Sequence, residues 1–145
     1  SPFKKCDRPV QGLGGSMLPS HQWIAVDPDL TGFGWTTGQG GGMSINPSDG
    51  PSAPGQDVEC KNCTPSNGML LYGSGMGKSG TTASYAEIKE CLKKVPVRRP
   101  YNLLVYNCRD WTVDAEGACG LDCSSGPSFP LTSGGPGNYP TRPMR

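Results

Sequence analysis

Seven cysteines constrain this chain more than any other feature, because its 145 residues have a composition that favours loops. Glycine (22 residues) and proline (15 residues) are abundant and hydrophobic residues make up only 34%, so the core that the chain can bury is small. An odd number of cysteines in such a chain predicts disulfide-bonded cysteines together with one free thiol. The count alone does not say which cysteine is free.

If Cys108 is the free cysteine, the other six can form three disulfides in fifteen different ways. These six are Cys6, Cys60, Cys63, Cys91, Cys119 and Cys123. Each disulfide would add roughly 2–4 kcal/mol of stability, largely by restricting the unfolded chain. The sequence therefore favours a secreted protein that acts in a periplasm or in the extracellular space, where disulfides persist. A cytosolic protein with reduced cysteines is the alternative.

One apolar segment leads directly to a cysteine: residues 101–108 read Y-N-L-L-V-Y-N-C and are followed by R-D-W. We expect the segment to be extended and Cys108 to open a helix that runs to about Ala118. At a helix N-terminus, unpaired backbone N–H groups and the positive end of the helix dipole stabilise an anion. The position therefore favours a nucleophilic thiolate. A core or disulfide-bonded cysteine is the alternative interpretation.

A nucleophilic cysteine needs a base, and the chain has one histidine, His21. Residues 21–27 are predicted to form a strand that is covered on both faces, and residues 30–37 a second strand that pairs with it as a hairpin. We expect His21 to take the proton of Cys108, and the backbone N–H of Cys108 to stabilise the oxyanion. A structural histidine on the strand is the alternative.

The motif Y-N-L-L-x-x-N-C, followed by a polar pair and an aromatic residue, resembles the cysteine segment of circularly permuted papain-like hydrolases. It is similar to the PPPDE peptidases and to the permuted NlpC-type domains of bacterial Rhs and type VI secretion toxins. In those families a histidine opens an early strand and the cysteine opens a later helix. The stretches S-H-Q-W-I-A-V-D (residues 20–27) and T-G-F-G-W (residues 31–35) match the histidine part, and the resemblance covers roughly residues 6–46 and 82–118.

The resemblance implies one α+β domain over residues 1–145, with a small antiparallel sheet packed on two helices in permuted papain-like order. It implies a cysteine-dependent amide hydrolase: a bacterial antibacterial effector that cleaves peptide bonds of peptidoglycan and is inhibited by an immunity protein. A protein-directed (iso)peptidase and an acyltransferase of the same fold are alternatives. A non-catalytic, disulfide-rich secreted binding module is the alternative from a different class.

The group that would orient the imidazole is left open. In papain-like sites a polar residue on the strand after the histidine has this role, and a Cys–His pair alone can also suffice. The candidates are Thr36, Thr37 and Gln39 on that strand, and Asp27 or Asp29 at the turn before it. Side chains expected to line the cleft are Asn107, Trp111 and Trp23.

The remaining segments carry weaker predictions. Residues 1–20 are expected to be an irregular N-terminal arm, and residues 124–145 a tail rich in glycine and proline. Residues 85–95 are predicted to be a helix, because Ser84 and Glu87 form a capping box and apolar residues follow at helical spacing. Residues 68–72 are predicted to be a short strand, followed by a glycine loop that lines the cleft and lacks the first glycine of a phosphate-binding loop.

The charge and composition also limit the partners. A net charge of +1 gives no argument for nucleic acid, and no apolar run has the length of a membrane span. The pairs Cys60/Cys63 and Cys119/Cys123 suggest a structural zinc site as an alternative, but disulfides fit the odd count better. We therefore expect neither a metal ion nor another cofactor.

Overall fold

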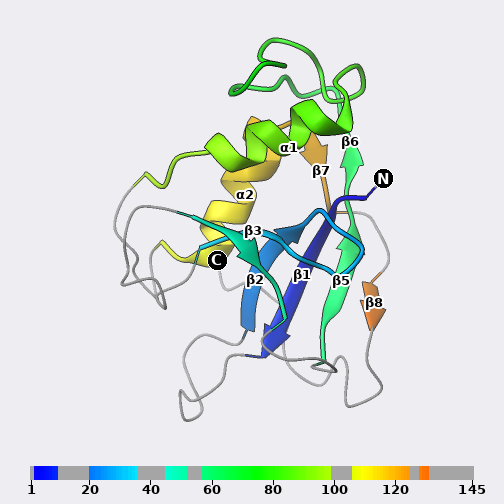
Figure 1. Cartoon of the computed structure of the whole chain (residues 1–145), viewed down its shortest axis with the longest axis vertical. Coiled ribbons are helices and arrows are strands. Elements are labelled where there is room, and N and C mark those ends of the chain that lie inside the picture. Colours follow the sequence, from blue (N-terminus) through cyan, green and yellow to red (C-terminus); the bar gives the residue numbers. More distant parts are fainter. Residues whose placement is uncertain are drawn as a thin grey trace.

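A computed structural model of the chain describes residues 2–9, 20–35, 45–51, 57–98, 106–124 and 128–130. These residues form a large antiparallel sheet, a small two-stranded sheet and two helices, with the helices gathered toward one end of the large sheet (Figure 1). The prediction of an α+β fold with an antiparallel sheet packed on two helices is therefore confirmed.

The large sheet has six strands in the order β4-β3-β2-β1-β5-β8. Its strands are β1 (Lys4–Pro9), β2 (Ser20–Ala25), β3 (Gly32–Gly34), β4 (Asn46–Asp49), β5 (Glu59–Asn62) and β8 (Ser128–Pro130). All six residues of β2 are buried, as predicted for a strand covered on both faces. β2 also pairs with β3 in the predicted antiparallel arrangement, with Ile24 opposite Phe33.

The expectation of an irregular arm over residues 1–20 is wrong for β1. This strand lies inside the sheet, between β2 and β5, and a disulfide joins its Cys6 to Cys60 of β5. Its sequence, K-K-C-D-R-P, has no apolar alternation, so the strand depends on its two neighbours and on the disulfide. Residues 10–19 lie outside the described residues. In the expected tail, residues 128–130 pair with β5 as β8.

The segment at residues 68–72 is not a strand, which corrects a further prediction. Its one strand-like contact is an isolated bridge between Met69 and Ser79. The backbone bonds instead to the end of the second helix, with Leu71 N–H donating to Ala118 O at 2.8 Å. Nearby, Gly80 packs against Gly120. A Cβ on Gly80 would lie 2.2 Å from Gly120 O, so the absence of a side chain at Gly80 allows the two segments to approach closely.

The two strands of the small sheet, β6 (Thr64–Pro65) and β7 (Leu121–Asp122), flank these two segments in the sequence.

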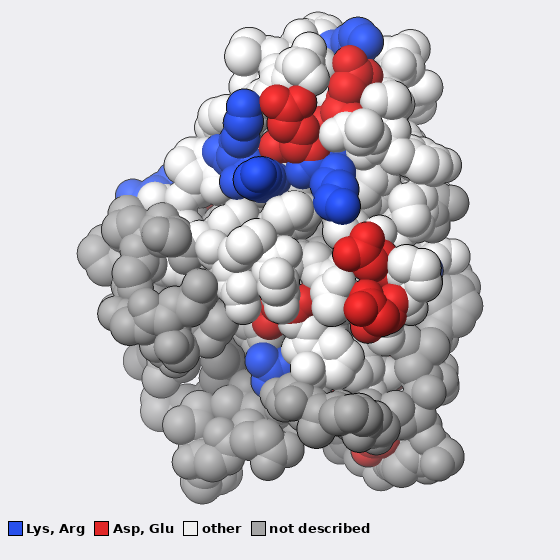
Figure 2. Space-filling model, in the orientation of Figure 1, with Lys and Arg blue, Asp and Glu red and all other residues white. Residues whose placement is uncertain are grey.

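Helix α1 (Tyr85–Lys94) forms as predicted, and both hydrogen bonds of the capping box between Ser84 and Glu87 are present. Two glutamates on its outer face form ion pairs: Glu87 pairs with Lys78 of the preceding loop, and Glu90 pairs with Lys94 of the same helix. Figure 2 shows acidic and basic side chains intermingled over this part of the surface. The glycine loop packs on the same helix, where Ser74 Oγ donates to Glu90 Oε1 at 2.6 Å.

Helix α2 (Cys108–Ala118) starts at the predicted residue and packs mainly on β2. The main core lies between the helices and the sheet and includes Ile24, Phe33, Leu92 and Trp111. Trp111 is completely buried there.

Three disulfides tie the elements together: Cys6–Cys60, Cys63–Cys123 and Cys91–Cys119. Cys108 is the free cysteine, as predicted. Cys60 and Cys63 belong to two different disulfides, and the described part of the chain contains no cluster of side chains suited to a metal ion. Three disulfides are consistent with a secreted protein. Neither helix in the described ranges has the length and apolar character needed to cross a membrane.

Candidate functional site

The N-terminus of α2 is fixed by a second capping box. The Asn107 side chain accepts a hydrogen bond from Arg109 N–H at 3.0 Å, and Asp110 Oδ2 accepts one from Asn107 N–H at 2.8 Å. These bonds satisfy backbone donors that a helix start leaves open, so the helix begins at Cys108. Asn107, which we expected in the cleft, and Asp110 thus have a defined structural role at this terminus.

His21 is buried on β2 and contacts an acidic residue that the sequence did not single out. Its Nε2 lies 2.6 Å from Oδ2 of Asp49. Burial lowers the pKa of His21, but the hydrogen bond to Asp49 and the interaction with the Cys108 side chain outweigh burial and raise this pKa to about 9. The imidazole therefore interacts with both Cys108 and Asp49, and it is protonated at neutral pH.

Asp49 reaches His21 from β4, two strands away, because β3 carries a glycine between them. A Cβ on Gly34 would lie 2.0 Å from Asp49 Oδ2 and 2.8 Å from the Cβ of Trp23. The missing side chain of Gly34 thus leaves the space through which the Asp49 carboxylate crosses the sheet. Asp49 also accepts a hydrogen bond from Gly50 N–H at 2.8 Å, which fixes its other oxygen.

Of the predicted orienting groups, the two that the structure describes, Asp27 and Asp29, do not occupy this position. Asp27 is exposed at the turn after β2 and accepts a hydrogen bond from Thr31 Oγ1, as does Asp29, so the prediction of Asp27 for this role is wrong. Thr36, Thr37 and Gln39 lie outside the described residues. Asp49 was missed because it lies among proline, serine and glycine residues, and its approach to His21 depends on the pairing of β4 with β3.

Arg8 lies on the same face of the sheet as His21. The two residues are directly opposite each other in the pairing of β1 with β2. The Arg8 guanidinium lies 5.9 Å from the centre of the Trp23 ring, and its Nε donates to Gly50 O at 2.9 Å. Trp23 in turn stacks on His21 with ring centres 5.8 Å apart. Trp23, which we expected in the cleft, therefore packs directly beside the imidazole.

The opposite face of β1 and β2 holds the first turn of α2. Arg109 is 1% exposed and forms an ion pair with Asp7 at 3.2 Å, and its guanidinium also donates to Ser20 Oγ. Thr112 Oγ1 donates to Gln22 Oε1 at 2.5 Å. Burial raises the pKa of Asp7 against the opposing effect of Arg109. Because neighbouring residues of a strand alternate between faces, the same two strands hold both His21 and the helix that begins at Cys108.

Cys108 itself is completely buried, and His21 is only 4% exposed. A nucleophile must be reached by its substrate, and the Cys108 side chain is not exposed in this structure. The thiol nevertheless lies close enough to His21 to interact with the imidazole. Burial lowers the pKa of the Arg8 guanidinium, and the nearby Asp49 and Cys108 side chains oppose this effect without reversing it. The geometry therefore brings together the two predicted reactive residues and adds Asp49 and Arg8.

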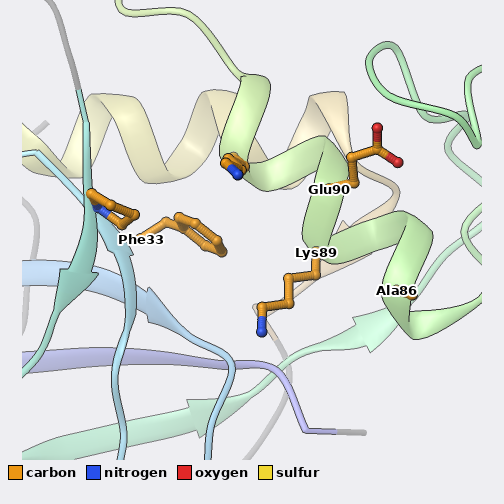
Figure 3. A pocket seen from close by; sticks show the side chains of 6 residues that line it. Phe33, Ala86, Lys89 and Glu90 are labelled. Carbon is orange, nitrogen blue, oxygen red and sulfur yellow. The ribbon is translucent and has the colours of Figure 1, made fainter.

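A separate groove of about 410 Å³ lies on the helix side of the sheet, between α1 and strands β3 and β4 (Figure 3). Its lining residues are Phe33, Pro47, Ala86, Lys89, Glu90 and Lys93. Phe33 points into the groove, whereas the next residue, Gly34, borders Asp49 on the other face of β3. The groove therefore does not contain the cluster of His21, Asp49 and Cys108. The glycine loop, expected to line the cleft, packs on α1.

Comparison of the chain with known protein families, with curated proteins and with solved structures finds no match.

Proposed function

We propose that this protein is a cysteine-dependent amide hydrolase of permuted papain-like fold, in which Cys108 is the nucleophile, His21 its proton partner and Asp49 the orienting group. One observation carries the proposal: the single histidine interacts with the free cysteine at a helix start and is bonded on Nε2 to a buried carboxylate. Nucleophile, base and orienting residue in this relation are the arrangement that thiol-dependent acyl transfer requires.

The interaction of the imidazole with Cys108 supports transfer of the thiol proton to His21, which leaves a thiolate as the nucleophile. The thiolate attacks the substrate carbonyl carbon, and a C–S bond forms while the carbonyl π-electrons move to oxygen. Since Asp49 engages Nε2, Nδ1 of the imidazolium is the donor to the leaving amine when the C–N bond breaks. Water then attacks the thioester, His21 takes its proton, and the carboxylic acid and the thiol group are released.

For the substrate we propose a peptide bond of peptidoglycan, and for the biological role an antibacterial effector that acts in a periplasm. The motifs around His21 and Cys108 support this choice, since they resemble those of secreted bacterial toxin domains. The three disulfides support an oxidising compartment. An immunity protein would be the inhibitory partner. Cleavage of a protein (iso)peptide bond and acyl transfer use the same chemistry and are distinguished by their products.

A non-catalytic secreted binding module is a second candidate, and the complete burial of Cys108 favours it. In such a module the three disulfides and the small core would stabilise the fold, and Cys108 would be an inert core thiol. The two candidates differ in the reactivity of that thiol in the native protein.

The test is alkylation of the native protein with iodoacetamide between pH 4 and pH 9, with the labelled site mapped by mass spectrometry. A hydrolase is expected to label fast at Cys108, already at pH 6, and at least tenfold more slowly in His21→Ala. Purified peptidoglycan should then release new amino and carboxyl termini with the native protein and none with Cys108→Ala. Labelling of Cys108 only after addition of urea would overturn the hydrolase and leave the binding module.

A further inference from the structure

Four neighbouring strands each contribute one residue to a cluster on one face of the sheet. Arg8 of β1 is paired with His21 of β2, His21 binds Asp49 of β4, and the Asp49 carboxylate approaches over Gly34 of β3. The mechanism above uses His21 and Asp49, and Gly34 supplies the space between them. It assigns nothing to Arg8, although this side chain belongs to the same cluster.

Arg8 reaches from β1 to the Asp49 end of this cluster. Its Nε donates to Gly50 O at 2.9 Å, and its Nη2 lies 3.9 Å from Asp49 Oδ1. The guanidinium lies over the ring of Trp23. Arg8 therefore contacts both the carboxylate that orients His21 and the next backbone carbonyl. A planar, rigid guanidinium suits such a two-point contact better than a flexible ammonium group.

The charges of the cluster balance with the proton on either group. Arg8 and Asp49 carry one positive and one negative charge, and transfer of the thiol proton from Cys108 to His21 adds one charge of each sign without changing the sum. What matters is therefore where the charged groups lie, and the Arg8 guanidinium lies on the same face of the sheet as His21.

The other charged groups near Cys108 do not change this balance. On the opposite face of β1 and β2, Asp7 and Arg109 form an ion pair whose charges cancel. In the first turn of α2, Asp110 is engaged by the backbone of Asn107. Arg8 is thus the cation, besides His21, that acts on the sulfur from the sheet face.

We propose that Arg8 is a positioning residue: it holds Asp49 against His21 and supplies the second positive charge that keeps Cys108 as a thiolate. The inference rests on the proposed function, since it assigns Arg8 a role in preparing the same nucleophile. A residue that merely filled space beside Trp23 would affect stability and leave the ionisation of Cys108 unchanged.

The experiment measures the rate of Cys108 alkylation against pH in the native protein and in Arg8→Met, Arg8→Lys and His21→Ala. Arg8→Met is expected to lower the rate at pH 6 about tenfold and to move the midpoint of the profile upward by about one pH unit. Arg8→Lys keeps the positive charge but loses the planar guanidinium. Its alkylation profile should therefore lie between those of the native protein and Arg8→Met. It also keeps a long side chain over Trp23, and it serves as the test if the methionine variant does not fold.

Arg98→Met is the matched control. Arg98 also lies over an aromatic ring, that of Tyr106 at 5.2 Å, and binds a carboxylate, that of Asp114 at 3.0 Å. This control should leave the alkylation profile unchanged, and all variants should label at the same rate in urea.

The outcomes separate the two proposals. If His21→Ala slows alkylation while both Arg8 variants follow the profile of the native protein, the role of Arg8 is wrong and the hydrolase stands. If His21→Ala has no effect, or if native Cys108 does not react, the proposed function itself fails.

Discussion

The two helices of this protein begin with the same device and use it in opposite surroundings. Both start with a capping box, Ser84 with Glu87 in α1 and Asn107 with Asp110 in α2. The first turn of α1 faces solvent and carries ion pairs that water screens. The first five residues of α2 are all buried, although three of them are Arg109, Asp110 and Thr112. The cap in α1 stabilises a helix, whereas the cap in α2 also fixes a buried polar turn that begins with a thiol.

Breaking the buried ion pair below α2 should have the largest effect on this contrast. Asp7→Ala leaves Arg109 buried without its carboxylate, which is expected to cost about 3–5 kcal/mol in the free energy of unfolding. Urea unfolding measures the change. The control is Glu90→Gln in α1, which removes an exposed partner of Lys94 and should have a far smaller effect. Equal losses in the two variants would show that the polar turn of α2 is no more demanding than the surface of α1.

The surroundings of the two helices should also respond to pH in opposite directions, because His21 on β2 interacts with Cys108 at the start of α2 and Glu90 lies on α1. The pKa of His21 is raised to about 9 in the folded protein, against an ordinary value near 6.5. Its contribution to stability is therefore complete below pH 6.5 and is lost as the pH rises through 9, by an amount on the order of 3 kcal/mol. Hydrogen bonds from Ser74 lower the pKa of Glu90 on α1 to about 2, so its contribution is present above pH 4.5 and lost as the pH falls.

Urea unfolding at pH 6 and at pH 9.5 measures the His21 effect, with His21→Gln as the variant that should lack the slope. The chain has one histidine, so its NMR titration reports this pKa directly. A midpoint near 6.5 in the folded protein would contradict the pairing with Asp49 and Cys108.

The smallest expected effect comes from the caps themselves. Ser84→Ala and Asn107→Ala should each cost about 1 kcal/mol in the free energy of unfolding, since each removes one capping hydrogen bond. Only Asn107→Ala should also slow alkylation of Cys108, because only α2 presents a thiol at the capped end. A change in the alkylation rate in Ser84→Ala would contradict the separation of the two helices.

The sequence predicted those parts of the fold that local patterns encode. The capping box and the helical spacing of Ile88, Cys91 and Leu92 are contained within α1, and they were enough to place it. The start of α2 followed from an apolar run that ends at Asn107 and Cys108. The odd number of cysteines indicated one free thiol because oxidised cysteines pair.

The parts that the sequence did not predict depend on distant partners. β1 contains two lysines, an aspartate and an arginine, so its sequence alone does not indicate a strand. It forms one because β2 and β5 pair with it on either side and because a disulfide joins its Cys6 to Cys60. Asp49 follows a proline and a serine in a stretch typical of loops. Its role depends on β4 pairing with β3 and on the gap at Gly34, and neither is a local property.

The order of the cluster along the chain has a consequence for biosynthesis. Arg8, His21 and Asp49 are synthesised before Cys108 and the helix that it begins, which follow 59 residues after Asp49. A chain interrupted between Asp49 and Cys108 therefore contains the imidazole and its carboxylate but not the thiol. Such a chain also lacks α2, which packs on β2, so the cluster forms only after α2 has been synthesised.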